Sequence, residues 1–247
     1  MNLAVRRSFL KFSFHECAVA ALALSAAISP AAVYGRPLPP RAPAKPAPES
    51  AGALAPDKGK FRIVLAGQEV GTEDFEISTT GGKWTVRGST EAHTAGGGDM
   101  RTTGLLQLAA DGTPIHYAWT ADSPKKASGT VDFDGGTAKT STDFGGGSPY
   151  HEDFKFTSPL IIVLDNNLYE QFAVLARLYD WSAGGEQSFP VVIPQDITPG
   201  TIKVSVGASA SELVVKTADL EIHLFCDASH KLTRIEVPAS NVVVERQ

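Results

Sequence analysis

The chain has 247 residues, of which 43% are hydrophobic and 20% are charged, and its formal net charge is −5 at pH 7. The negative charge is concentrated in residues 59–247, which hold 15 Lys and Arg against 24 Asp and Glu, a net charge of −9. Nucleic-acid binding depends on cationic side chains that displace counterions from phosphates, so this composition disfavours a nucleic-acid partner. The same balance disfavours docking by charge on an anionic membrane surface.

Residues 1–35 are predicted to be a signal peptide. Arg6, Arg7 and Lys11 make a basic start, and the apolar, alanine-rich run 17–28 follows, with small residues after it. The apolar run is shorter than the roughly 20 residues that cross a bilayer. We therefore expect an exported protein of the periplasm, cell surface or extracellular space that does not span a membrane after cleavage. An uncleaved anchor or a buried helix is the alternative.

Residues 36–58 are predicted to be a disordered linker rich in proline and alanine. The segment has no apolar periodicity and carries prolines at a density that neither a helix nor a sheet tolerates. Such a composition is typical of an extended, polyproline-type spacer. A proline-rich ligand for a binding module is the alternative interpretation.

From Lys60 onward, apolar residues alternate with polar ones and the alternation is broken by turns rich in glycine and aspartate. Phe61, Ile63 and Leu65 show the pattern, and Thr80-Gly81-Gly82-Lys83 is one of the turns. Alternation bounded by such turns is typical of half-buried antiparallel strands. The predicted strands are 61–65, 70–77, 84–88, 101–108, 115–120, 131–133, 189–193, 202–206, 213–216, 220–226, 232–237 and 241–245.

One helix is predicted over residues 168–179. Leu168, Phe172, Leu175 and Tyr179 recur at intervals of four, three and four residues, which places them on one face of a helix. The preceding Asp165-Asn166-Asn167 supplies side-chain acceptors suited to an N-cap, and asparagine tolerates a turn at positive φ. The alternative for this cluster is a polar site at the mouth of the sheet.

About a dozen strands and one helix predict an all-β fold. We expect a large curved antiparallel sheet, or open half-barrel, with one α-helix packed against it, forming a single antiparallel β domain over residues 59–247. An apolar helix stripe of this kind most simply packs on the concave face or closes its mouth.

Three short motifs carry a family resemblance. They are Phe61-Arg62-Ile63-Val64-Leu65 with Gly67 and Gly71, then Asp165-Asn166-Asn167 leading into the helix, then the segment 184–191 that opens the next strand. With the order of elements, these motifs resemble secreted bacterial domains of unknown function that share a half-barrel with the periplasmic lipoprotein carriers. The resemblance implies a scaffold with an apolar concavity, and it brings no catalytic residues.

Two sets of residues are candidates for a binding site. An aromatic set falls on the predicted inward faces, where core packing is the default, although an open sheet would let the same residues line a groove for an apolar ligand. A polar set would lie at the rim of that groove. The aromatic set is Trp84, Tyr117, Trp119, Phe154, Phe156 and Phe172, and the polar set is His151, Asp153, Asp165 and Asn167.

No catalytic, metal or cofactor signature stands out. Neighbouring residues of a strand point to opposite faces, so at most His151 and Asp153 of His151-Glu152-Asp153 could share one ion. No Gly-x-Ser-x-Gly elbow is present, and the glycine runs 96–98 and 145–147 are predicted turns. His116 and His223 are expected at the surface, and Cys226, the one cysteine after the leader, as a small buried apolar residue.

Three functional hypotheses follow. The first is an exported, non-enzymatic binding protein of the cell envelope for a lipid or other apolar ligand held in the concave face of the sheet. The second is a structural or assembly module of the envelope that binds a protein partner through an exposed edge strand. The third is a secreted hydrolase whose site is unmarked in the sequence and lies around His151, Asp153 or Asp165.

Overall fold

The computed structural model describes residues 54–93, 98–122, 126–217 and 219–247. The predicted signal peptide and most of the predicted linker lie outside the described residues. The elements are β1 (Asp57–Leu65), β2 (Gln68–Thr80), β3 (Lys83–His93), β4 (Asp99–Leu108), β5 (Pro114–Asp122), β6 (Lys126–Asp134), β7 (Thr137–Asp143), β8 (Tyr150–Lys155), β9 (Ile162–Val163), α1 (Glu170–Leu178), β10 (Gln187–Ile193), the 3₁₀ turn η1 (Pro194–Asp196), β11 (Thr198–Val206), β12 (Glu212–Lys216), β13 (Glu221–Cys226), β14 (Leu232–Val237), the 3₁₀ turn η2 (Pro238–Ser240) and β15 (Val242–Arg246). Because β1 begins at Asp57, the last two residues of the expected linker belong to the sheet.

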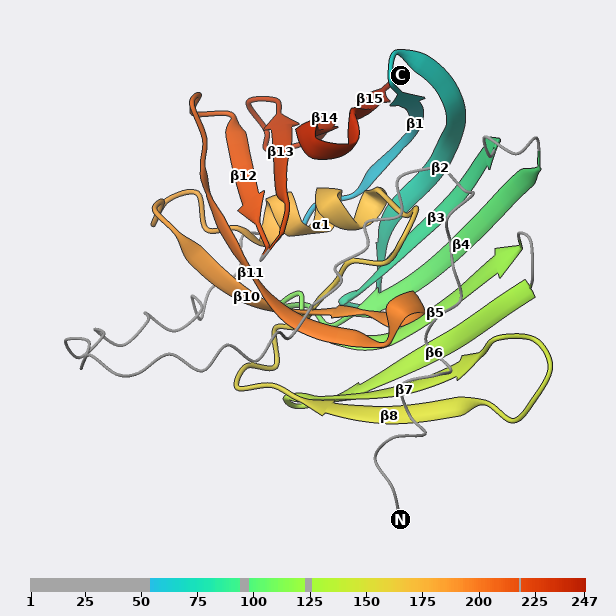
Figure 1. Ribbon diagram of the computed structural model, residues 1–247. Coiled ribbons are helices and arrows are strands. Elements are labelled where there is room, and N and C mark those ends of the chain that lie inside the picture. Colours follow the sequence, from blue (N-terminus) through green and yellow to red (C-terminus); the bar gives the residue numbers. More distant parts are fainter. Residues whose placement is uncertain (1–53, 94–97, 123–125, 218) are drawn as a thin grey trace, which may run out of the picture.

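The strands form a single open sheet. Their order is β8-β7-β6-β5-β4-β3-β2-β1-β15-β14-β13-β12-β11-β10-β9, and every neighbouring pair is antiparallel except β9 and β10. The first and last strands, β1 and β15, pair in the middle of this order, whereas β8 and β9 end it and do not pair with each other. The expected all-β architecture with a curved, open sheet is confirmed, and Figure 1 shows the two halves curling around α1.

The hairpin turns form where the glycines predicted them. Between β2 and β3, Gly81 and Gly82 adopt φ values of 60° and 76°, a left-handed conformation that suits the twist of a two-residue hairpin. The flanking residues Thr80 and Lys83 are paired directly across this turn. The turn therefore sets the register of β2 on β3, and with it the set of side chains that face inward.

The inner face of the sheet carries the apolar residues of the alternation. Phe61 and Ile63 of β1 are 0% and 2% exposed, and Phe75 and Ile77 of β2 are buried beside them. The rings of Phe61 and Phe75 stack with their centroids 4.8 Å apart. Burial of such side chains stabilises the fold by about 1.5–3 kcal/mol each.

Helix α1 lies inside the curve of the sheet. It contacts β3 in one half of the sheet and β13 and β14 in the other, and Figure 1 shows it between the two halves. The predicted face of Leu168, Phe172, Leu175 and Tyr179 is fully buried, as expected. The expected packing of the helix on the concave face is confirmed, and its burial goes further, because all nine helical residues except Arg177 are buried. A helix enclosed on every side is an interior element of the fold.

A buried ion pair joins the two ends of the described chain. Both carboxylate oxygens of Asp57 accept hydrogen bonds from the guanidinium of Arg246, at 2.7 and 3.0 Å, and Lys231 Nζ lies 3.1 Å from Asp57 Oδ1. The Asp57 side chain is 1% exposed. Burial alone would raise the pKa of this carboxyl, but the hydrogen bonds from Arg246 and Lys231 outweigh it and lower the pKa.

Asp57→Ala is expected to destabilise the protein by about 3 kcal/mol, because it leaves the largely buried guanidinium of Arg246 without its counter-charge. The measurement is urea unfolding at pH 6. The control is Asp74→Ala, since Asp74 is 70% exposed and pairs with Lys60 at 3.5 Å, a contact worth less than about 1 kcal/mol. Equal losses in the two variants would contradict the role given to Asp57.

Candidate functional site

The six aromatic candidates all lie in or against the main core of the protein. Tyr117 and Trp119 of β5 and Phe172 of α1 are buried in the main core. Trp84, Phe154 and Phe156 are half-buried and pack against the same core. The predicted inward orientation is thus correct for all six residues, and three of them are packed within the core itself.

The half-buried phenylalanines lie at the β8 end of the sheet. Phe133 of β6 and Phe154 of β8 lie in one cross-strand row, joined through Ala138 of β7. Phe156 follows β8 and is tied to the β6–β7 turn by its amide, which donates to the carbonyl of Gly136 at 2.7 Å. We call Phe133, Phe154 and Phe156 the seam cluster. It lies at the β8 end of the sheet, just before the chain enters the interior at β9.

A buried carboxylate, Glu73 of β2, holds the N-terminus of α1. Its Oε2 accepts a hydrogen bond from the amide of Tyr169 at 2.7 Å, and its Oε1 accepts one from the amide of Glu170 at 2.8 Å. The hydroxyl of Thr90 lies 2.8 Å from Glu73 Oε2 and also contacts the carbonyl of Asn167. Glu73 is 0% exposed, so a side chain 97 positions away supplies the helix cap.

The capping role expected of Asp165-Asn166-Asn167 is therefore wrong. The N-cap position of α1 is Tyr169, which makes no side-chain capping bond. Asn167 does adopt the positive φ expected of it, 61°. The sequence placed the turn correctly, but the capping acceptor comes from the sheet.

Glu170 lies against a glycine of the sheet. A Cβ at Gly88 would come within 2.5 Å of the carboxyl carbon of Glu170, and a Cβ at the cross-strand neighbour Gly104 would come within 2.7 Å of Leu168 Cδ1. The two glycines thus make room for the first turn of α1. The Glu170 carboxyl is hydrogen-bonded to that of Glu73, while its own Oε2 is buried without a partner in the described part of the chain.

Asp165 joins the overlapping ends of the sheet. Its Oδ2 accepts a hydrogen bond from the hydroxyl of Tyr117 at 2.8 Å, and its Oδ1 accepts one from the amide of Gln195 in η1 at 2.9 Å. Gln171 of α1 completes the network, donating to the Tyr117 hydroxyl at 3.2 Å. Because η1 also contacts β6 and β7, this network fastens the β10 end of the sheet over its other half.

Burial dominates the electrostatics of these three acids. Desolvation raises the pKa of Asp165 to about 7, against the opposing effect of the hydrogen bonds that it accepts. Burial raises the pKa of Glu73, and burial together with the charge of Glu73 raises that of Glu170 well above the ordinary range. No ion pair among the described residues involves any of the three carboxyls. Uncompensated carboxyls of this kind are unusual in a core and cluster at functional sites.

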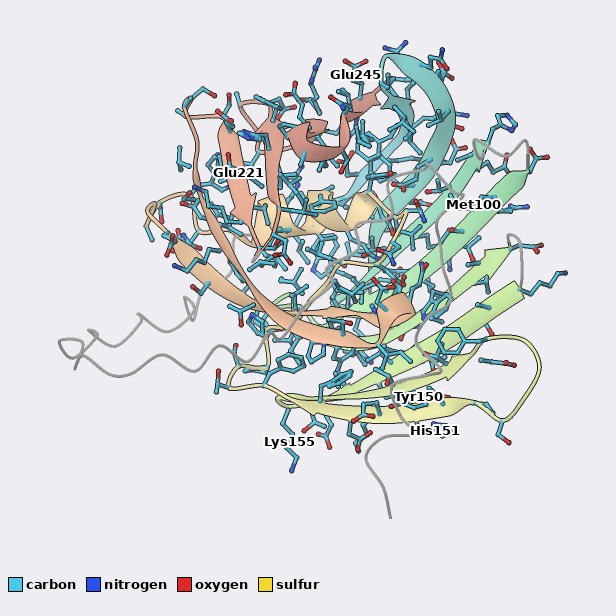
Figure 2. All side chains as sticks on the ribbon, viewed as in Figure 1. Met100, Tyr150, His151, Lys155, Glu221 and Glu245 are labelled. Atoms are coloured by element: carbon cyan, nitrogen blue, oxygen red, sulfur yellow. The ribbon has the colours of Figure 1, made fainter. Side chains whose placement is uncertain are left out.

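The four residues of the expected polar rim do not come together. His151 and Asp153 are exposed on β8, on the face opposite to Phe154, and Figure 2 shows His151 beside Tyr150 at one end of β8, with Lys155 at the other end. Asp165 is buried inside, and Asn167 is half-buried at the start of the α1 region. The sheet wall therefore separates the two outer residues from the two inner ones.

The two histidines expected at the surface and the cysteine expected in the core lie mainly where they were predicted. His116 is part-exposed and its Nδ1 lies 2.7 Å from Asp132, while His223 sits between Glu212 and Glu221 with its side chain 24% exposed. Cys226 is buried, and burial raises the pKa of its thiol to about 12. Such a thiol is a weak nucleophile at neutral pH.

A shallow depression of about 590 Å³ lies on the outer face of β2–β5, on the opposite side of the sheet from α1. Its lining includes Arg87, Arg101, Leu105 and Ala118. Among the described residues, no group of three or more His, Cys, Asp or Glu is placed to hold a metal ion. No helix in the described part of the chain is both long and apolar enough to cross a membrane.

No family model matches the sequence, and no curated protein matches it. Among solved structures, the fold is similar to a β-barrel-like protein of the domain of unknown function DUF1849 from Brucella abortus, with a TM-score of 0.51 and 11% identity over 79% of this chain and 96% of that one. A DUF1089 family protein from Pseudomonas aeruginosa matches with a TM-score of 0.46 and 11% identity over 83% of this chain and 98% of that one. At this identity, the first similarity shows the fold alone.

Proposed function

We propose that this chain is an exported, non-enzymatic binding protein of the cell envelope, which holds a lipid or other apolar ligand on the inner face of its sheet, beside α1. The observation that carries the proposal is an apolar interior, occupied by one enclosed helix, behind a sheet whose end strands β8 and β9 do not pair. The proposed export rests on the predicted signal peptide. The resemblance to periplasmic lipoprotein carriers is likewise part of the proposal.

The seam cluster gives the ligand a route inward. Phe133, Phe154 and Phe156 are half-buried where β8 ends the sheet, and they pack directly against the core around α1. An apolar chain that entered there would replace water on these rings and then meet the apolar core behind them. Each square ångström of apolar surface buried in this way contributes roughly 25 cal/mol.

Substitution of phenylalanine at three positions tests the site. Phe172→Ala and Phe156→Ala are each expected to change the Kd for a fluorescent fatty acid at least fivefold, because each removes an aromatic ring from the inner apolar surface. Phe144→Ala is the matched control, since Phe144 is 54% exposed in the β7–β8 connection. The measurement is a fluorescence titration of the purified protein. Unchanged uptake in a folded Phe172→Ala variant, or no uptake by the wild type, would contradict the proposal.

A protein partner at the β8 edge is the second candidate. β8 ends the strand order, so one edge of it pairs with no other strand of the described sheet, and an edge of this kind accepts an added strand. Phe144 and Tyr150, which are 54% and 47% exposed, flank the loop that leads into it. A photo-crosslinking residue at position 144 tests this function: capture of one defined envelope protein in cells supports it, and absence of any adduct contradicts it.

The hydrolase hypothesis finds no support in the geometry. A hydrolytic site needs its nucleophile or base and its acid within hydrogen-bond reach of one substrate. His151 and Asp153 lie on the outer face of β8, whereas Asp165 is 5% exposed within the core. We therefore retain the binding functions and set the hydrolase aside.

A further inference from the structure

The contact between β2 and α1 depends on bound protons. Glu73 and Glu170 are hydrogen-bonded to each other through their carboxyl groups. An ionised carboxylate has no proton to donate, so two carboxyls can form this bond only while one of them is protonated. Both side chains are buried, at 0% and 1% exposure, so water cannot replace the missing donor.

Thr90 indicates that Glu73 itself carries a proton, in addition to the one in the bond between the two carboxyls. Its hydroxyl lies within hydrogen-bond distance of two acceptors, Glu73 Oε2 and the carbonyl of Asn167, but it has one proton to donate. If Thr90 donates to the Asn167 carbonyl, a protonated Glu73 can donate to Thr90 in turn, and both contacts are satisfied. If Glu73 is ionised, Thr90 can donate its proton to only one of the two acceptors, and the other acceptor receives no hydrogen bond from Thr90.

No ion pair with a positively charged side chain of the described residues balances these groups. Besides Glu73 and Glu170, the titratable side chains around this contact are Tyr169 at the start of α1, Asp165 before α1 and Tyr117 of β5, with Asp196 of η1 reaching Asn166. All of them are neutral or negative at neutral pH. When both carboxyls of the Glu73–Glu170 pair have lost their protons, two negative charges therefore face each other in a low-dielectric interior.

We propose that Glu73 and Glu170 form a proton-dependent latch that holds the N-terminal turn of α1 in the sheet while a proton is shared, and releases this turn when both carboxyls ionise. The latch acts on the first turn because Glu73 also accepts the amides of Tyr169 and Glu170. Released, this turn would uncover the inner face at Gly88 and Gly104, against which Glu170 and Leu168 lie. This last step rests on the proposed function, since it would open the interior to a ligand; the latch itself does not.

Hydrogen exchange read by mass spectrometry on the whole protein tests the latch. Between pH 5.5 and pH 8.5, after correction for the intrinsic exchange rate, protection of amides 169–173 is expected to fall at least tenfold relative to amides of β14. Glu170→Gln keeps the shape of a protonated carboxyl and cannot ionise, so it is expected to remove this difference. The control is Glu186→Gln, because Glu186 is exposed and pairs with Lys203 on the surface.

The outcomes separate the latch from the binding function. Protection at 169–173 that follows β14 at every pH in the wild type would overturn the latch, and this readout stands even where Glu170→Gln fails to fold. Persistence of the pH effect in a folded Glu170→Gln variant would also overturn it. Fatty-acid uptake measured at both pH values reports on the binding function alone. A pH-dependent release of α1 without any uptake would support the latch and contradict the proposed binding of an apolar ligand.

Discussion

The free energy of unfolding is expected to fall by about 3 kcal/mol between pH 5 and pH 8 from Asp165 alone. Burial raises the pKa of this carboxyl from 3.8 to about 7 in the folded protein. A carboxyl whose pKa is raised by folding stabilises the folded protein fully at a pH below its pKa in the unfolded chain. This stabilisation is lost as the pH rises to the pKa of the carboxyl in the folded protein. Each pH unit between the two values costs about 1.4 kcal/mol. Glu73 and Glu170, whose pKa values are also raised, add to the loss in the same direction.

A different set of carboxyls limits stability at low pH. The hydrogen bond from Arg62 lowers the pKa of Glu245, and that from His223 lowers the pKa of Glu212. Stability from these groups is present above their unfolded pKa values and is lost as the pH falls through the folded ones. The two trends together place the maximum of stability near pH 4 to 5.

Urea unfolding followed by tryptophan fluorescence, at intervals of half a pH unit, measures this dependence. Asp165→Asn removes one titrating group and is expected to flatten the decline between pH 5 and pH 8, although it weakens the contact with Tyr117. Asp153→Asn, at an exposed position on β8, is the matched control and is expected to leave the slope unchanged. Stability that is constant or rises from pH 5 to pH 8 would contradict the assignment of buried, unpaired acids.

Gly88→Val is expected to destabilise the protein by about 3 kcal/mol. The new Cβ would lie 2.5 Å from the carboxyl carbon of Glu170, a distance that side chains do not tolerate. Glu170 cannot simply swing aside, because its carboxyl is bound to Glu73 and its backbone amide to the same side chain. Overpacking of a filled interior costs about 1–3 kcal/mol and occasionally more.

Thermal unfolding of paired variants isolates this effect. Gly147→Val is the matched control, because a Cβ at Gly147 meets nothing within 4 Å, and it is expected to change stability by less than about 0.5 kcal/mol. In a Glu170→Ala background, which removes the obstructing carboxyl, Gly88→Val is expected to cost less than it does alone. An equal cost in both backgrounds would show that strand conformation, and not the contact with Glu170, makes glycine necessary.

The local pattern of the sequence predicted twelve of the fifteen strands of the described sheet and missed β7, β8 and β9, where the apolar alternation is weak or short. Strand β14 has the predicted bounds of 232–237, and the alternation placed Phe61, Ile63, Phe75 and Ile77 on the inner face correctly. These features depend on neighbouring residues and on turns such as Gly81-Gly82, which are local in the chain. The all-round burial of α1 was missed because Glu170 and Gln171 mark its first turn as polar.

The buried acids could not be assigned from local pattern alone. Glu73 lies on the same face of β2 as Phe75 and Ile77, because the three residues are two positions apart. The sequence could therefore have predicted an inward-facing carboxyl at this position. Its partners, however, lie 96 and 97 positions further on, and nothing in the sequence brings Tyr169 and Glu170 to β2. Asp165 likewise became a core residue only because η1 folds back over β6 and β7.

Native mass spectrometry of the mature protein, isolated from the envelope of its own host, tests the central claim most directly. The proposed function predicts an added mass of lipid size that stays with the folded protein and is lost on denaturation. Fatty-acid titration of the same sample after delipidation should then restore a complex. A protein that is free of added mass and takes up no fatty acid at either pH 5.5 or pH 8.5 would contradict the proposal and favour a protein partner at the β8 edge.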